Sequence, residues 1–495
     1  MKRNAVFIST YLLLYQFVFA QDFGDYQKIR KDKLLNDLEI LYQALDNYHS
    51  GMYWYTPKDS VDLAFDEVKK KITTDLNVLE FNRLIAPLVA LSREDHTNIY
   101  LPESTMKKLD TESQFMPLHV VFLGTKLYLA KNGSNHQEFP IEGMEIELIN
   151  GEKPTAIVNK IGSLFASDGF IKIVKFSDLN CFNFSKYYFY YYGQINQFEI
   201  KLKHRDDPLL LKSLKIPEIN KNLETRYPNI KIKEEKKELL QYKMLHSSIA
   251  YLGIHSFSNS DIREASKEKK IKPFLKNSFR SIHENKISTL IVDVSKNGGG
   301  TEGNDGLLFS YLGENYQKYV KVRAKTQKAI LDNETDAPIN LKTFGFFEKT
   351  LMNKKMEDGS LERREWIGHG LMAYKKEPKY KFSGKVYIII SPITYSGGSE
   401  FSNMVYTRDL ATFVGQETGG GYLGNTSGYS KELVLPNSKI TIDIPSLQFV
   451  MNVTPKLPFG RGVIPHYEVI PTYEQFLNGE NAALKFILEQ LEKTD

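Results

Sequence analysis

The first third of the chain shows helical periodicity. One apolar helix face is predicted near the start of the chain, and two further helices are predicted over residues 61–72 and 79–91. A polar loop, residues 92–102, then breaks the pattern. These signals predict an N-terminal helical domain over residues 21–105. The first face is formed by Leu34, Leu35, Leu38, Leu41 and Leu45.

The next hundred residues change to short alternating strands. Apolar and polar residues alternate in PLHVVFLGTKLYLA and again in GMEIELINGEKP, and the pair Asn150-Gly151 predicts a tight turn. Residues 106–205 are therefore expected to form a small β-rich module. The charged, weakly patterned stretch 206–247 is expected to be a connector with some strand.

From Ile249 onward, strands and helices alternate. IAYLGIHSF and STLIVDV read as strands, and a helix face lies between them. This alternation predicts an α/β core over residues 248–495, interrupted by a charged insertion at about 326–380. A final amphipathic helix is expected over residues 482–491.

Composition describes a folded protein of several domains. The chain has 495 residues, of which 41% are hydrophobic and 25% charged, so two or three domains are expected. A net charge of +5 is small for this length and gives no basis for binding nucleic acid. The single cysteine, Cys181, excludes an internal disulfide and is expected to be buried.

The N-terminus has the pattern of a signal peptide. Lys2 and Arg3 precede a mostly apolar stretch from Ala5 to Phe19, which is short for a membrane span. Val18-Phe19-Ala20 fits the small-residue rule for cleavage. Residues 1–20 are therefore predicted to be removed, leaving an exported protein, periplasmic or extracellular, with no stable membrane span.

Ser396 lies in the setting most suggestive of chemistry. It follows the apolar strand of KVYIIISPITYSGGSEF and precedes two glycines and a helical pattern. A serine at such a turn exposes its hydroxyl, and the N–H of Gly397 lies where a helix dipole would stabilise an oxyanion. Alternatively, Ser396 or Ser399 caps the helix.

A glycine cluster ends the earlier strand LIVDVSKNGGG. Asn297 to Gly300 lacks the lysine and hydroxyl residue of a phosphate-binding P-loop. Gly299 and Gly300 could present N–H groups to a carbonyl oxygen, or form only a tight turn.

A serine nucleophile needs a base, and His96 is the histidine with a distinctive setting. It lies in the polar turn Glu94-Asp95-His96-Thr97, although a surface or capping role is the alternative. No HExxH or paired CxxC spacing occurs, so no metal or other cofactor is expected.

Together these segments resemble a known family. An Asp-His-Thr turn, a β-rich module, NGGG, TYSGGSEF, VGQETGGGYLGNTSG, LPNS and GRGVIPHYEV follow in that order. The order is similar to that of the tail-specific (C-terminal processing) serine peptidases, in their tricorn-like branch. The resemblance implies a crotonase-like ββα core, a helical cap, a PDZ-like module at residues 106–205 and hydrolysis of polypeptide substrates.

The resemblance also implies roles for individual residues. Ser396 matches the nucleophile, Gly397 an oxyanion donor, Gly299 and Gly300 the loop with the second donor, and His96 the base. No oligomeric state is implied.

Two positions depart from the family pattern. Where another branch has a catalytic lysine, this chain has Thr418-Gly419-Gly420-Gly421-Tyr422, so a Ser-Lys mechanism is unsupported. Near Gly-Val-x-Pro, where the tricorn-like branch places a glutamate, the chain has Phe459-Gly460-Arg461. Asp95 is the remaining candidate to orient His96.

The sequence therefore predicts an exported serine-type endopeptidase. Two rivals stay open: a catalytically degenerate protein on the same scaffold that binds a peptide or an apolar ligand, and an esterase with the same machinery.

Overall fold

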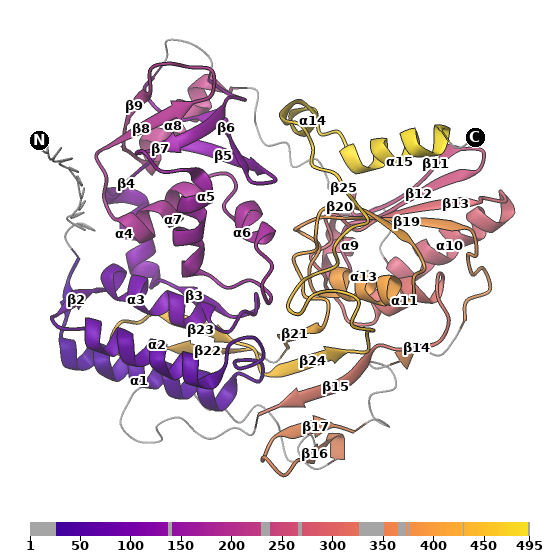
Figure 1. Cartoon of the computed structure of the whole chain (residues 1–495), viewed down its shortest axis with the longest axis horizontal. Helices are drawn as coiled ribbons and strands as arrows, with labels where there is room; N and C mark the ends of the chain where they lie inside the picture. The colour runs from indigo at the N-terminus through magenta and orange to yellow at the C-terminus, as the bar shows by residue number, and fades with distance from the viewer. Residues whose placement is uncertain are drawn as a thin grey trace, which may run out of the picture.

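The computed structural model describes residues 26–136, 141–228, 238–265, 270–325, 351–364, 373–374, 377–428 and 430–493. The predicted signal peptide and most of the predicted insertion lie outside these residues. The described chain has a mixed α/β fold, as predicted, with an N-terminal half and a C-terminal half (Figure 1). None of its described helices is both long and apolar enough to cross a lipid bilayer.

The predicted N-terminal helices are confirmed, with bounds shifted by a few residues. They are α1 (Lys31–Tyr48), α2 (Lys58–Lys71) and α3 (Val78–Ala90), followed by α4 (Glu103–Glu112). The α1 face points into a core, because Leu34, Leu38, Leu41 and Leu45 are at most 4% exposed. A capping box fixes the start of α3: Asn77 accepts from the Glu80 N–H, and Glu80 accepts from the Asn77 N–H.

The predicted β-rich region and one strand of the predicted connector form a five-stranded antiparallel sheet, and we call this region the β module. Asn150 (φ +50°) and Gly151 (φ +77°) form the predicted turn after β7. Helices α5 (Pro154–Ile161), α6 (Ile173–Asp178) and α7 (Asn183–Tyr192) cover the sheet. Its strands, in spatial order, are β5 (Leu118–Leu123), β6 (Lys126–Asn132), β7 (Glu145–Ile149), β8 (Gln197–Leu202) and β9 (Leu209–Lys212).

The stretch 206–247 contains a helix that the sequence pattern did not predict. Strand β10 (Leu214–Lys215) leads into α8 (Ile216–Arg226), and strand β11 (Leu240–His246) follows later. Within α8 only Ile219 is fully buried, so its apolar periodicity is weak. Pro217 in its first turn starts the helix instead.

The C-terminal half is built on a six-stranded sheet, which we call the main sheet. Its first pair is antiparallel and the others are parallel. Helices α9 (Asn259–Ala265), α10 (Ile271–Glu284), α11 (Asn304–Ser310) and α13 (Gly397–Thr407) share the core on one face, and α15 (Ala482–Glu492) covers the other. The order is β11, β12 (Ile249–Ile254), β13 (Thr289–Asp293), β19 (Lys385–Ile390), β20 (Thr412–Gly415) and β25 (Tyr467–Glu468).

A second five-stranded sheet lies beside the main sheet. The described part of the predicted insertion contributes its outer hairpin, and strand β14 (Tyr316–Gln317) separately pairs with β18 (Ala373–Tyr374). The sheet has the order β16 (Asn353–Lys355), β17 (Leu361–Arg363), β15 (Tyr319–Ala324), β24 (Leu447–Met451) and β21 (Gly424–Ser427).

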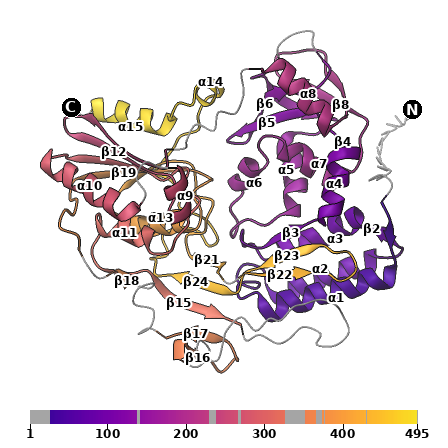
Figure 2. The same cartoon turned by 180° about the vertical axis from the view of Figure 1, so that it is seen from behind.

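A hairpin from the C-terminal half crosses into the N-terminal half. Strands β22 (Lys431–Val434) and β23 (Thr441–Ile444) form a sheet with β3 (Asn98–Tyr100). Figures 1 and 2 show this orange hairpin among the indigo helices. Its apolar side chains belong to the N-terminal core, so the helical region does not pack as a separate unit. They are Leu433, Leu435, Ile440, Ile442 and Ile444.

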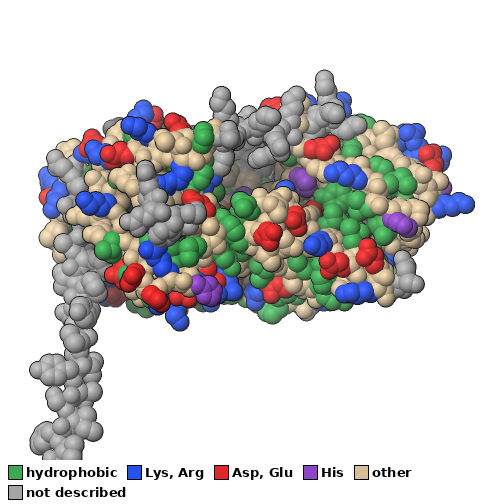
Figure 3. Space-filling model, turned by 90° about the horizontal axis from the view of Figure 1, so that it is seen from above, with side chains coloured by type: hydrophobic (Ala, Val, Ile, Leu, Met, Phe, Trp, Pro, Cys, Tyr) green, Lys and Arg blue, Asp and Glu red, His purple; other side chains and the backbone are tan. Residues whose placement is uncertain are grey.

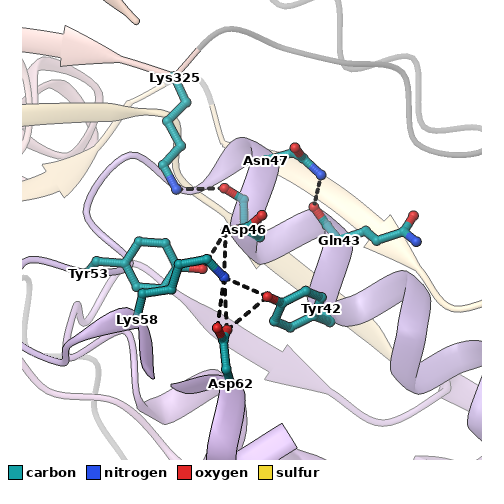
Figure 4. A network of polar contacts seen from close by, with 8 residues as sticks. All are labelled: Tyr42, Gln43, Asp46, Asn47, Tyr53, Lys58, Asp62 and Lys325. Atoms are coloured by element: carbon teal, nitrogen blue, oxygen red, sulfur yellow. Dashed lines mark hydrogen bonds and ion pairs between the residues drawn. The ribbon is translucent and has the colours of Figure 1, made fainter. Parts of the chain in front are cut away.

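Lys325, just after β15, makes a second link between the halves (Figure 4). Its Nζ donates to the Asp46 carbonyl oxygen at 2.6 Å, and its N–H donates to Ser50 Oγ at 2.9 Å. Burial lowers the pKa of Lys325 to about 8. Beside it, Lys58 forms ion pairs with Asp46 and Asp62.

Cys181 is exposed, so the expectation of a buried cysteine is wrong. It lies before α7 at φ +60°, and its backbone pairs with Val120 at the edge of the β module. The turn directs its side chain outward.

Candidate active site

Two turns meet at one end of the main sheet. Strands β13 and β19 are parallel neighbours, with Leu290 opposite Val386. Because parallel strands end at the same edge, the segments after them lie together. One segment contains Asn297 to Gly300 and the other contains Ser396, so the structure joins these two predicted parts of the site.

Ser396 has the strained backbone of a residue on a sharp strand-to-helix turn. Its φ is +47° and its ψ is −124°, a region that residues with a Cβ rarely occupy. It precedes α13 directly, yet its side chain makes no cap hydrogen bond. The alternative of a capping Ser396 is therefore wrong. Ser399 does not cap either, since its hydroxyl donates to the Thr394 carbonyl oxygen at 2.9 Å.

One of the predicted glycines, Gly299, packs directly against Ser396. A Cβ on Gly299 would lie 2.6 Å from Ser396 Cβ and 3.0 Å from the Gly397 nitrogen, so only glycine fits there. The Gly299 N–H already donates to Asn297 Oδ1 at 2.8 Å. Within the described residues, the N–H groups of Gly397 and Gly300 have no such partner. The Gly298 N–H lacks one as well, so elimination leaves Gly397, Gly298 and Gly300 as candidate donors, and Gly299 contributes its small size.

The glycine-rich segment after β20 packs against the same turn. A Cβ on Gly420 would lie 3.3 Å from the Ser396 nitrogen and 2.0 Å from Ser399 Oγ. The Gly421 N–H donates to Asp168 Oδ2 at 3.0 Å, so the backbone here binds a carboxylate of the β module. We call residues 418–421 the glycine loop.

His96 is held by bonds on both sides of its turn. The Asp95 N–H donates to Asp168 Oδ1 at 2.8 Å. On the other side, Thr97 Oγ1 lies 2.7 Å from Nε2 of the buried His49. The Gly51 N–H donates to His49 Nδ1, which leaves the His49 proton on Nε2, donated to Thr97. Strand β3 follows directly and pairs with β23.

Burial and charge act on His96 in opposite directions. Burial is the larger effect and lowers its pKa, whereas the negative charges of Asp95 and Glu400 raise it. Its Nδ1 is buried and has no hydrogen-bond partner in the described part of the chain. A neutral imidazole near pH 7 can accept a proton, and the two carboxylates would stabilise the imidazolium that forms.

Asp95 does not fix the ring by a hydrogen bond between the described side chains. Its charge acts on His96, while its backbone is bound to Asp168. Burial raises the pKa of Asp95 to about 6.

Behind Ser396 lies a buried cluster of charges. Lys318 Nζ is 2.6 Å from Asp305 Oδ2 and 2.6 Å from Glu400 Oε2, and all three side chains are at most 9% exposed. Asn425 donates to the other oxygen of Glu400 at 3.0 Å. Glu400 is four residues after Ser396 on α13, and it is the member of this cluster whose negative charge raises the pKa of His96.

The surface is hollowed between the two halves (Figure 3). Beside the glycine loop, the Tyr55 ring lies 5.2 Å from that of Phe459 and 6.0 Å from that of Phe170. Phe459 is 54% exposed and Phe170 40% exposed, so this cluster offers apolar surface to a bound chain.

Several polar residues of the site were missed in the sequence. Glu400 had a usable signal, because it is four residues after Ser396 on a predicted helix. Asp168, His49, Asp305 and Lys318 had none, because long-range packing brings them to the site.

Comparisons with known proteins bear on the family and the fold. Residues 248–469 match the model of peptidase family S41. Mature CPAF is 14% identical over 90% of this chain and 94% of its own, with a TM-score of 0.56. Mature CPAF complexed with lactacystin is also 14% identical, over 94% of this chain and 99% of its own, with a TM-score of 0.58. At such identity these structures show a shared fold. No curated protein matches the chain.

Proposed function

Because residues 248–469 are a peptidase family S41 domain, we propose that this chain is an exported serine-type endopeptidase with Ser396 as nucleophile and His96 as base. One observation supports the proposal most: Ser396 has a strained backbone, its hydroxyl makes no cap hydrogen bond, and it lies directly against Gly299. A capping or packing serine has no need of that strain.

The proposed mechanism gives each of these groups one role. His96 accepts the Ser396 proton as Oγ attacks the carbonyl carbon of a peptide bond. The carbonyl oxygen becomes an oxyanion that accepts hydrogen bonds from the N–H groups of Gly397 and Gly300. His96 then gives its proton to the leaving amine, and water hydrolyses the acyl-enzyme by the reverse transfers.

The buried carboxylates assist the proton transfer. Glu400 lies where its charge raises the pKa of His96, as Asp95 does from the adjacent position. Lys318 and Asn425 hold Glu400 in place. Glu400 thereby supplies a negative charge that the chain lacks near Gly-Val-x-Pro.

The test is reaction of the mature protein with a fluorophosphonate, which labels activated serines. The wild type should be labelled, and both Ser396→Ala and His96→Ala should lose at least about 10³-fold in labelling rate. Ser399→Ala is the matched control, since it removes a neighbouring hydroxyl that donates only to Thr394. It should keep its labelling.

Peptide and ester substrates then separate the peptidase from an esterase. Cleavage of both is expected, because an acyl-enzyme forms from either. Turnover of esters alone would overturn the peptidase proposal. Absence of labelling in a folded wild type would overturn the assignment of Ser396 as the nucleophile.

A further inference from the structure

A short segment of the β module reaches into the site. Residues 167–171 lie between the 3-10 turn Gly162–Leu164 and α6. Figures 1 and 2 place α6 on the side of the module that faces the C-terminal half. Asp168, at the centre of this segment, is 1% exposed.

One side of the segment binds the turn that carries His96. The Asp95 N–H donates to Asp168 Oδ1 at 2.8 Å, and the Gly169 N–H donates to the Arg93 carbonyl oxygen at 2.9 Å. The Arg93 guanidinium lies over the Phe170 ring, 4.6 Å from its centre.

The other side binds loops of the C-terminal half. The Gly421 N–H donates to Asp168 Oδ2 at 3.0 Å, and the Phe170 N–H donates to the Gly460 carbonyl oxygen at 2.6 Å. A Cβ on Gly169 would lie 2.3 Å from that carbonyl oxygen, so the two backbones are in close contact.

The two partners of Asp168 adjoin the two reacting groups. Asp95 immediately precedes His96. Gly421 follows Gly420, which packs on the Ser396 backbone. One carboxylate therefore spans from the turn that carries His96 to the glycine loop, which packs on the turn that carries Ser396.

Asp168 binds two N–H groups but forms no salt bridge within the described residues. Burial raises its pKa to about 6, although the two N–H groups oppose this effect. Burying a carboxylate without an ion-pair partner lowers the stability of the fold. We therefore attribute to Asp168 a role in holding the two segments that its oxygens bind.

We propose that Asp168 is a positioning residue through which the β module sets the placement of His96 relative to Ser396. The proposal rests on the proposed function. It assigns to the module a direct part in assembling the site, separate from any role in holding substrate.

Asp168→Asn is the sharpest variant, because it keeps the shape but points an amide NH₂ at one of the two N–H donors. We expect kcat and the fluorophosphonate labelling rate to fall by about 10- to 100-fold, with KM within about threefold. Glu199→Gln, on β8 of the same module, is the control. The Glu199 side chain is exposed on the far strand from this segment, so kcat should be retained.

Hydrogen exchange provides a second test, and its wild-type measurement does not depend on a variant folding. The amides of Asp95 and Gly421 should be protected in the wild type, and in Asp168→Asn both should exchange faster while β13 stays protected. Fast exchange of either amide in the wild type would overturn the proposal. So would a folded Asp168→Asn that keeps its kcat or changes only KM. An inactive wild type would instead count against the proposed function.

Discussion

At the scale of single residues, the account depends on buried charge around His96. Glu400→Gln should shift the rise of kcat/KM with pH to lower pH, because removing a negative charge lowers the pKa of His96 further. The rate itself should fall by about tenfold, since the imidazolium loses stabilisation. A pH–rate profile measures both effects.

Asp305→Asn is the control for this prediction. It also removes one partner of Lys318, but Asp305 is not among the charges that act on His96. Its profile should keep the wild-type midpoint. Identical shifts in the two variants would contradict a specific role for Glu400.

Asp178 gives a prediction about stability. Burial, with the charge of Asp95, raises its pKa to about 7, above an unfolded value of about 3.9. Its contribution to stability is therefore present below pH 4 and is lost as the pH rises through 7. Urea unfolding should find Asp178→Asn more stable than wild type by about 1–3 kcal/mol at pH 8, and similar at pH 4. If Asp178→Asn and the wild type were equally stable at both pH values, the raised pKa of Asp178 would be refuted.

At the scale of elements, the site depends on the close contact between the turns after β13 and β19. Gly299→Ala adds a Cβ at 2.6 Å from Ser396 Cβ, at φ +101°. Peptide hydrolysis should fall by at least about 100-fold because the turn must move. Gly298→Ala is the control, since its Cβ meets nothing within 4 Å, and it should stay within about threefold of wild type. Equal rates for the two variants would refute the contact.

Much of this element-level picture was predictable. The apolar runs before Ser396 and Gly299, and the glycines after them, carried a local signal, and the family S41 resemblance is confirmed over residues 248–469. Helix α8 was missed because its apolar face is weak. The roles of Asp168 and His49 could not be predicted, because the hydrophobic periodicity of a sequence does not show which distant segment a buried polar side chain contacts. The β module as PDZ-like, the signal peptide and the export remain predictions.

At the scale of the whole molecule, the crossing hairpin joins the two halves. Ile442 on β23 is fully buried in the N-terminal core. Ile442→Ala should lower the free energy of unfolding by about 2–5 kcal/mol, as measured by urea denaturation. Leu63→Ala, at a side chain that is 62% exposed, should cost less than about 0.5 kcal/mol. If Ile442→Ala lowered the free energy of unfolding as little as Leu63→Ala, the hairpin would not be needed for the stability of the N-terminal core.

The central claim is that Ser396 cleaves peptide bonds, and the most direct measurement is mass spectrometry of an unfolded polypeptide incubated with the mature protein. New chain ends should form with the wild type and with Ser399→Ala, and none with Ser396→Ala. Cleavage by Ser396→Ala at the wild-type rate, or intact polypeptide after incubation with a folded wild type, would contradict the account.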